Sequence, residues 1–170
     1  IGFDKDGLVS KSTAADSPMR KWFLENCSPG KFCGSMTEAL KGADVFIGVS
    51  ISNVISEADV KSMAPDSIVF ALANPDPEVD PTIARQYAAV VATGRSDQPN
   101  QINNVLAFPG IFRGLLDARI NKITDGMLVN AAEAIASCVT SEQLNSNFIV
   151  PSVFDQSVVT KVAAAVKKSV

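Results

Sequence analysis

Histidine is absent from this chain of 170 residues. Its absence excludes Ser-His-Asp and Cys-His catalysis from the chain, together with every metal site that depends on imidazole ligands. Tryptophan and tyrosine occur once each. Any chemistry carried by these residues must therefore come from carboxylates, lysines, amides, hydroxyls or backbone groups.

Cysteine, positive charge and long apolar runs are also scarce. The three cysteines are odd in number and show no CxxC spacing, which indicates reduced thiols and a cytoplasmic protein. No apolar run approaches the ~18 residues of a membrane span, and the first residues do not read as a signal peptide. A net charge of -3 argues against a nucleic-acid partner, which calls for a basic face.

What the sequence does contain is an alternation of apolar runs and helix-start signals. The runs expected to form buried strands are residues 43–49, 67–73 and 88–92. Helices are expected after Ser17-Pro18, over 37–41, after Ser56, after Asp80-Pro81, and over 108–119, 124–139 and 156–168. The alternation predicts one domain, residues 1–170, built on a mostly parallel α/β sheet with helices on both faces.

Polar or small residues stand where the expected strands end, and ligands of parallel α/β sheets bind at that edge. The first strand is expected to end at Asp4, the next at Gly48 and Ser50, and the next at Asn74. Asp4 precedes a Lys-Asp-Gly turn. Its side chain is therefore expected either to form an Asx-type turn or to contact a ribose. The alternative for Gly48 and Ser50 is that they simply terminate the strand. The alternative for Asn74, which precedes a proline, is a residue of a turn.

The longest polar stretch runs from Thr93 to Asn104, between two apolar runs. Such a loop is typical of binding and catalytic segments. Its last residues, Asn103 and Asn104, offer amides that can hold a carboxylate or hydroxyl without adding charge; the alternative is that they stabilise the loop itself. Arg95 is the cation of this loop, and its guanidinium could donate two hydrogen bonds to the carboxylate of a ligand. The alternative is that the nearby carboxylate of Asp97 already accepts these hydrogen bonds.

Several segments carry a family resemblance: ADVFIGVS (43–50), MAPDSIVFALANPDPEVDP (63–81), VVATGRSDQPNQINNVLAFPGIFRGLLDARINKIT (90–124) and FIVPSVFD (148–155). They resemble the NAD(P)-binding domain of malic enzymes, most closely the shorter bacterial type. FDKDGL (3–8) resembles the acidic strand end and turn that follow the dinucleotide fingerprint in that family. The resemblance implies a Rossmann-like, doubly wound fold. It also implies oxidation of (S)-malate with NAD(P)+ and decarboxylation to pyruvate and CO2, with Mg2+ or Mn2+ as Lewis acid.

The resemblance also implies site residues. The cofactor contacts would be Asp4, Gly48, Val49, Ser50, Asn74 and Asn103. Asp4 would approach the adenosine ribose, and residues 48–50 would lie against the dinucleotide through small size and backbone groups. Asn74 would contact the nicotinamide half or the substrate. Asn103 and Asn104 would reach the nicotinamide ribose and the carboxylate or hydroxyl of malate, which orients malate under the hydride acceptor.

The catalytic and metal-binding groups of malic enzymes lie outside the matching segments. The tyrosine acid, lysine base, carboxylate metal ligands and glycine-rich phosphate loop precede the region that aligns, and no G-x-G-x-x-G occurs here. Tyr87 matches nothing catalytic. We therefore expect no catalytic or metal-binding residue in this chain, and a sheet that is incomplete because the fingerprint strand is absent. The chain would be an inactive fragment of a longer enzyme, which binds the metal elsewhere and forms a homo-oligomer, in the simplest case a dimer.

Two other functions and the choice of cofactor stay open. Malolactic enzyme, a close relative, converts malate to lactate with bound NAD. The other alternative is a non-catalytic NAD-binding or structural α/β domain, which would keep the surface of the malic enzyme domain but take no part in a reaction. Asp4 favours the 2′-hydroxyl of NAD, and Lys11 and Ser12 stand where the family often carries Gly-Arg. NAD is therefore the expected cofactor, with NADP as the alternative.

Overall fold

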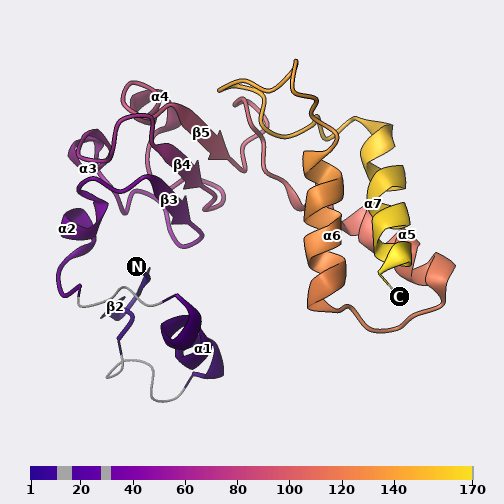
Figure 1. Cartoon of the computed structure of the whole chain (residues 1–170). Helices are drawn as coiled ribbons and strands as arrows, with labels where there is room; N and C mark the ends of the chain where they lie inside the picture. Colours follow the sequence, from indigo (N-terminus) through magenta and orange to yellow (C-terminus); the bar gives the residue numbers. More distant parts are fainter. Residues whose placement is uncertain (11–16, 28–31, 170) are drawn as a thin grey trace.

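A computed structural model describes residues 1–10, 17–27 and 32–169. Figure 1 shows an N-terminal hairpin with one helix, a small parallel sheet with short helices, and three longer helices that lie beside the sheet. The polar loop after the last strand joins the sheet to the longer helices. Across these ranges no helix combines the length and the hydropathy of a membrane span.

The N-terminal hairpin forms around the Lys-Asp-Gly turn. Strands β1 (Phe3–Asp4) and β2 (Gly7–Leu8) pair antiparallel. Gly7 has φ 97°, a left-handed conformation that glycine adopts without steric cost. Ser17 then caps helix α1 (Pro18–Asn26), as predicted. The predicted strand end and turn are confirmed, although β1 and β2 form a two-stranded sheet of their own rather than part of the parallel sheet.

Three strands form the parallel sheet in the order β3-β4-β5. They are β3 (Val45–Gly48), β4 (Ile68–Ala71) and β5 (Val90–Thr93). The register places Gly48 beside Ala71 and Ala71 beside Thr93. The carboxyl ends of all three strands therefore lie level at one edge of the sheet.

One face of this sheet packs against short helices. The helices are α2 (Met36–Leu40), α3 (Glu57–Lys61) and α4 (Pro81–Ala84). Val69 and Val91, at 0% and 2% exposure, share a core with Leu40 of α2, Val60 of α3 and Ala84 of α4. Apolar burial of this kind is the main stabilising contribution to a small α/β core.

The opposite face of the sheet is open at β3. Side chains of a strand alternate between faces, so Val45 and Ile47 point away from the packed core. They are 49% and 63% exposed. An α/β sheet with a parallel β3, β4 and β5 is thus confirmed, with helices on one face among the residues described. The second helix layer, the doubly wound strand order and the fingerprint strand stay predictions.

Three longer helices form a second core. They are α5 (Phe108–Ala118), α6 (Asp125–Ala136) and α7 (Gln156–Lys168), preceded by the 3-10 turn η1 (Asn104–Leu106). Glycines allow α5 and α7 to approach closely. A Cβ on Gly110 would lie 2.5 Å from the Cβ of Val162, and one on Gly114 would lie 2.8 Å from the Cβ of Val166.

Asn100 ties the sheet to the segment that follows α6. This side chain is 5% exposed, and its φ is 57°. Its amide nitrogen donates to the backbone carbonyls of Val91 (3.0 Å) and Ser146 (2.8 Å), and its oxygen accepts from the N–H of Ile149 (2.9 Å). Asparagine tolerates left-handed φ better than other side chains, so both its backbone and its amide are used here.

We expect Asn100→Ala to weaken the attachment of residues 146–149 to strand β5. The change removes three hydrogen bonds and leaves the buried carbonyl of Val91 and the partly buried groups of Ser146 and Ile149 without these partners, at a cost of roughly 2 kcal/mol or more. Amide hydrogen exchange in peptides around Ile149 should then accelerate by about 30-fold. Asn100→Gly, which keeps the left-handed backbone, serves as the control for strain and should show nearly the same acceleration. Unchanged exchange in both variants would contradict this role.

Candidate functional site at the strand ends

The residues at the carboxyl edge of the sheet come from three loops. β3 continues into Val49 and Ser50, β4 continues into Ala73 and Asn74, and β5 ends at Thr93. Because the strands are parallel and in register, these loops leave the sheet side by side. The structure therefore brings two of the predicted site segments, 48–50 and 74, to one edge.

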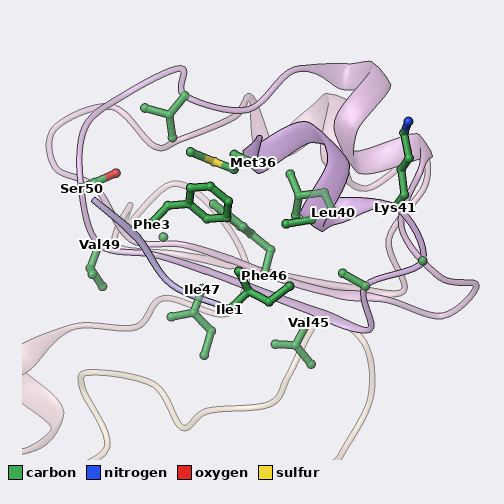
Figure 2. Close-up of a pocket in the computed structure, with 15 residues that line it drawn as sticks. Ile1, Phe3, Met36, Leu40, Lys41, Val45, Phe46, Ile47, Val49 and Ser50 are labelled. Carbon is green, nitrogen blue, oxygen red and sulfur yellow. The ribbon is translucent and has the colours of Figure 1, made fainter. Parts of the chain in front are cut away.

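The segment after β3 borders a cavity of about 430 Å³. Figure 2 shows Phe3, Met36 and Leu40 gathered on one side of β3, while Val45, Ile47 and Val49 point to the other side. Val49 is 77% exposed and Ser50 is also exposed, so both can be reached by a ligand. The apolar walls and the exposed strand end suit a flat, partly apolar ligand such as a nucleoside.

Gly48 is buried and faces a carboxyl group rather than open space. A Cβ at this position would lie 2.4 Å from Cδ of Glu78. The requirement for glycine at this strand end therefore has an explanation inside the protein: the side chain of Glu78 fills the space.

Glu78 is completely buried, at 0% exposure. One carboxylate oxygen accepts from the backbone N–H of Ser50 and the other from the N–H of Ala73, both at 2.9 Å. Its own backbone carbonyl accepts from the N–H of Ile55 at 3.2 Å. Sequence reasoning misses this residue, because an acid two positions before the cap Asp80 resembles an ordinary acid near a helix start.

Asn74 is exposed beside the Glu78 contact. The peptide bond between Asn74 and Pro75 is cis, and Ala73 immediately before it is held by Glu78. Among the described residues no hydrogen bond of the Asn74 amide is found, so its donor and acceptor atoms face solvent. The side chain is thus exposed at the strand edge, and its contact with cofactor or substrate stays a prediction.

Asp4 lies in an Asx-type turn and an ion pair. Its carboxylate accepts from the N–H of Asp6 at 2.9 Å and also contacts the guanidinium of Arg20. Arg20 reaches Asp6 as well, at 2.8 Å. The hydrogen bond from Arg20 holds the pKa of the Asp6 carboxyl below its ordinary value, and Asp6 raises the pKa of Arg20. The turn interpretation of Asp4 is confirmed, while its ribose contact stays a prediction.

The Thr93–Asn104 loop folds back onto the end of β5. Thr93 is fully buried; its N–H donates to the carbonyl of Asn100 at 3.3 Å, and its carbonyl accepts from Ile102 at 2.8 Å. Asn103 caps η1, because its side-chain oxygen accepts from the N–H of Val105 at 3.0 Å. Loop self-stabilisation therefore accounts for the oxygen of Asn103.

Asn104 differs from Asn103. It is exposed at the first position of η1, and no contact in the described ranges occupies its amide. An amide in this state offers one acceptor oxygen and two donor hydrogens to a ligand. Of the two asparagines at the end of the loop, Asn104 is the one with all of its side-chain hydrogen-bonding capacity available.

Arg95 is already paired. Its Nε and Nη2 donate to the two carboxylate oxygens of Asp97 at 2.9 and 2.8 Å, and its Nη1 lies 3.9 Å from Asp76. The hydrogen bond from Arg95 lowers the pKa of Asp97 to about 2. Because the folded-state pKa lies below the ordinary value of 3.8, the stabilisation from this pair is present above that value and disappears as the pH falls toward 2. At any pH near neutrality the ion pair between Arg95 and Asp97 is therefore formed.

If the protein acts on malate, as its resemblance implies, Arg95→Ala is expected to change kcat/KM for malate by less than about threefold. The guanidinium braces the loop through Asp97, and an exposed pair of this kind contributes little. The matched control is Arg113→Ala, another exposed arginine, paired with Asp117 on α5. Steady-state kinetics at several malate concentrations make the comparison. A rise of about tenfold or more in the KM for malate for Arg95→Ala alone would identify Arg95 as a substrate contact instead.

The strand edge offers groups that can contact an organic ligand. Nowhere in 1–10, 17–27 and 32–169 do three or more His, Cys, Asp or Glu side chains gather as a metal site. The strand edge offers backbone groups, exposed amides and an apolar cavity, which fit the nucleoside and nicotinamide parts of NAD(P). Lys11 and Ser12, which bear on the choice between NAD and NADP, lie outside the described residues.

Comparison with known proteins gives a consistent result. The family model described as malic enzyme, NAD binding domain, matches residues 1–170. The NAD-dependent malic enzyme of Geobacillus stearothermophilus is 50% identical over 166 residues, which cover 98% of this chain and 35% of that protein. The bifunctional malic/malolactic enzyme of Bacillus subtilis is 52% identical over 137 residues, 80% of this chain and 33% of that protein.

A solved structure agrees in fold. The NAD-dependent malic enzyme of Thermotoga maritima aligns with a TM-score of 0.84 at 42% identity, over 96% of this chain and 43% of that chain. Each of these matches covers most of the present chain and less than half of the relative. The present chain therefore spans about a third of the length of each of these two curated relatives.

Proposed function

Because the chain belongs to the malic enzyme family, we propose that it positions cofactor and substrate in an enzyme that oxidises (S)-malate and decarboxylates the product to pyruvate and CO2. The observation that carries the proposal is the edge where β3 and β4 end together. There, exposed Val49 and Ser50 line a cavity of about 430 Å³, and exposed Asn74 follows the neighbouring strand β4. Asn104, with its unoccupied amide, follows β5 by one loop.

In this proposal the residues act by binding and orientation. Residues 48–50 lie along the dinucleotide, with backbone groups and small side chains as contacts. Asn74 holds the nicotinamide half or malate, Asn103 donates from its amide nitrogen to the nicotinamide ribose, and Asn104 holds the malate carboxylate or hydroxyl. Fixing the reacting carbon near the hydride acceptor can contribute several kcal/mol to barrier lowering.

NAD(P)+ supplies the hydride acceptor when bound, and Mg2+ or Mn2+ polarises the substrate oxygen. We place the metal ligands and the proton-transfer groups in the remaining length of the enzyme, since the present chain spans about a third of its curated relatives. The open face of β3 supports a further layer that packs on the sheet. Val45 and Ile47 are exposed apolar residues on a parallel strand, and parallel strands are normally covered on both faces.

NAD is the proposed cofactor. Asp4 stands at the strand end expected to meet the adenosine ribose, and two carboxylates, Asp4 and Asp6, share the guanidinium of Arg20. An acid at this place favours the 2′-hydroxyl of NAD. Relatives include both NAD- and NADP-dependent malic enzymes, so NADP stays the alternative. A homodimeric, cytoplasmic enzyme is part of the same proposal.

A second function follows from one relative. The Bacillus subtilis protein is named a bifunctional malic/malolactic enzyme. Malolactic activity would use the same positioning residues, with the hydride returned to the product so that lactate leaves instead of pyruvate. The strand-edge geometry serves both reactions, because both begin by orienting malate against the nicotinamide.

Product analysis of the full-length enzyme tests these functions together. With malate, NAD+ and Mn2+, the proposal predicts equal amounts of NADH and pyruvate. Lactate without free NADH would favour malolactic enzyme, and neither product would favour a non-catalytic domain. The 170-residue chain alone should give no turnover. Appreciable turnover from it would contradict the proposal that the metal ligands and proton-transfer groups lie in the remaining length of the enzyme.

A further inference from the structure

Glu78 joins the two strand ends that the proposed site uses. It lies at the end of the turn that follows β4, and its carboxylate reaches back to Ser50, 28 residues earlier in the sequence. The second oxygen holds Ala73, next to Asn74. One buried side chain therefore sets the spacing between the segment after β3 and the segment after β4.

The surrounding backbone strengthens this link. Asn53 donates its N–H to the carbonyl of Pro77 at 3.1 Å, and Ile55 donates to the carbonyl of Glu78 at 3.2 Å. The loop after β3 is thus fastened to the 77–78 segment by main chain as well as by carboxylate. The carboxylate reaches Ser50, two residues beyond the end of β3, while the strand end itself is held by main chain, since Leu72 donates its N–H to the carbonyl of Gly48 at 3.0 Å.

The backbone around the carboxylate of Glu78 is shaped to hold it, because Gly48 packs closely against the carboxyl group. Gly48 provides the space, since a Cβ there would lie 2.4 Å from Cδ and 2.6 Å from a carboxylate oxygen of Glu78. A buried carboxylate is costly unless its oxygens are hydrogen-bonded, and each oxygen here has a backbone N–H donor. A carboxylate, unlike an amide, accepts at both oxygens, so the pair of N–H donors selects the acid.

We propose that Glu78 is a positioning residue that sets the distance between the dinucleotide-facing segment 48–50 and Asn74. This inference rests on the proposed function. Glu78 touches neither substrate nor cofactor, because it is fully buried. It acts through the backbone of Ser50 and Ala73. A displacement of either segment by a fraction of an ångström misaligns the ligand groups that those segments hold.

Glu78→Gln tests this proposal with little change in volume. The amide presents an NH2 group to one of the two backbone N–H donors, so one hydrogen bond is replaced by a donor facing a donor. In the full-length enzyme, we expect the KM for NAD+ and the KM for malate each to rise by about 10-fold or more. A residue with a merely structural role would reduce the amount of folded enzyme and leave both KM values of the folded fraction unchanged.

Asp59→Asn supplies the matched control. Asp59 is a second buried acid, 7% exposed, and it accepts from the N–H and the hydroxyl of Ser56 at 2.8 and 2.7 Å. These bonds cap α3 and involve no strand end. The control should lower thermal stability and leave both KM values unchanged. Equal KM shifts in Asp59→Asn and Glu78→Gln, or wild-type KM values in Glu78→Gln, would overturn the proposal.

A double-variant cycle decides the question if Glu78→Gln does not fold. Gly48→Ala should push the carboxylate aside and raise both KM values in the same way. Glu78→Asp withdraws the carboxyl group by one methylene and makes room for the new methyl group. The double variant should therefore show a smaller effect than the product of the two single effects. Effects that simply multiply would mean that the two positions act independently and would overturn the proposal.

Direct binding separates this inference from the proposed function. Isothermal titration with NAD+ should give about 10-fold weaker binding to Glu78→Gln than to the wild type. If the wild type binds NAD+ but produces no NADH from malate, the proposed function fails while the binding comparison still decides the role of Glu78. If the wild type turns over malate and NAD+ binding is unchanged in the variant, the role of Glu78 alone fails.

Discussion

Asn104→Ala in the full-length enzyme is expected to lower kcat/KM for malate by about 100-fold, or roughly 2.7 kcal/mol of transition-state stabilisation. The physical reason is that the amide of Asn104 is exposed and unoccupied at the start of η1, in the part of the chain that the structure describes. Such an amide can hold malate at no cost to the fold. Its removal should therefore act on the reaction rather than on stability.

The test compares malate kinetics with dinucleotide binding in the same variant. The dissociation constant for NAD+ should stay within about threefold of wild type, because the proposed dinucleotide contacts lie at residues 48–50, Asn74 and Asn103. Asn147→Ala, which also removes an exposed loop amide, is the matched control and should leave both quantities unchanged. Unchanged malate kinetics in Asn104→Ala would show that Asn104 does not contact the substrate.

Gly114→Leu is expected to separate α5 from α7 and to destabilise the protein by about 3 kcal/mol or more. A Cβ at this position would lie 2.7 Å from the backbone carbonyl oxygen of Ala163, as well as 2.8 Å from the Cβ of Val166. A backbone oxygen in a helix cannot rotate away as a side chain can. The helices must move apart and give up apolar contacts in the second core.

Gly126→Leu provides the control for this change. Gly126 lies in the first turn of α6 and is exposed, and the nearest atom to a Cβ added there would be the hydroxyl oxygen of Thr124, at 3.9 Å. Leucine has the better helix propensity, so this variant should be neutral or slightly stabilised. Thermal unfolding of the full-length enzyme makes the comparison. Equal midpoints for the two variants would contradict the close approach of α5 and α7.

Features that depend on local chemistry can be predicted well from the sequence. The sequence predicts helix α7 over 156–168, and the helix spans Gln156–Lys168, because Asp155 is a clear cap. The helix expected after Ser56 is also present as α3, and Ser56 and Asp59 form a capping box at its start. Short apolar runs indicate the three parallel strands, since charge-poor segments of that length are typical of buried strands.

Features that depend on contacts between distant segments cannot be predicted in this way. Glu78 contacts a residue 28 positions away in the sequence, and Asn100 contacts residues 46 and 49 positions away. Neither side chain differs in the sequence from an ordinary polar residue in a turn, because burial is decided by tertiary packing. In the Thr93–Asn104 loop, sequence reasoning singles out Asn103 and Asn104, while Asn100 holds the loop in place.

A crystal structure of the full-length enzyme with NAD+ and a non-reactive analogue of malate tests the central claim most directly. The account predicts that the dinucleotide lies along residues 48–50 and that the amide of Asn104 lies within hydrogen-bond distance of a carboxylate or hydroxyl of the analogue. It also predicts that Glu78 keeps its bonds to Ser50 and Ala73 in the complex. Ligands bound away from this strand edge would contradict the account.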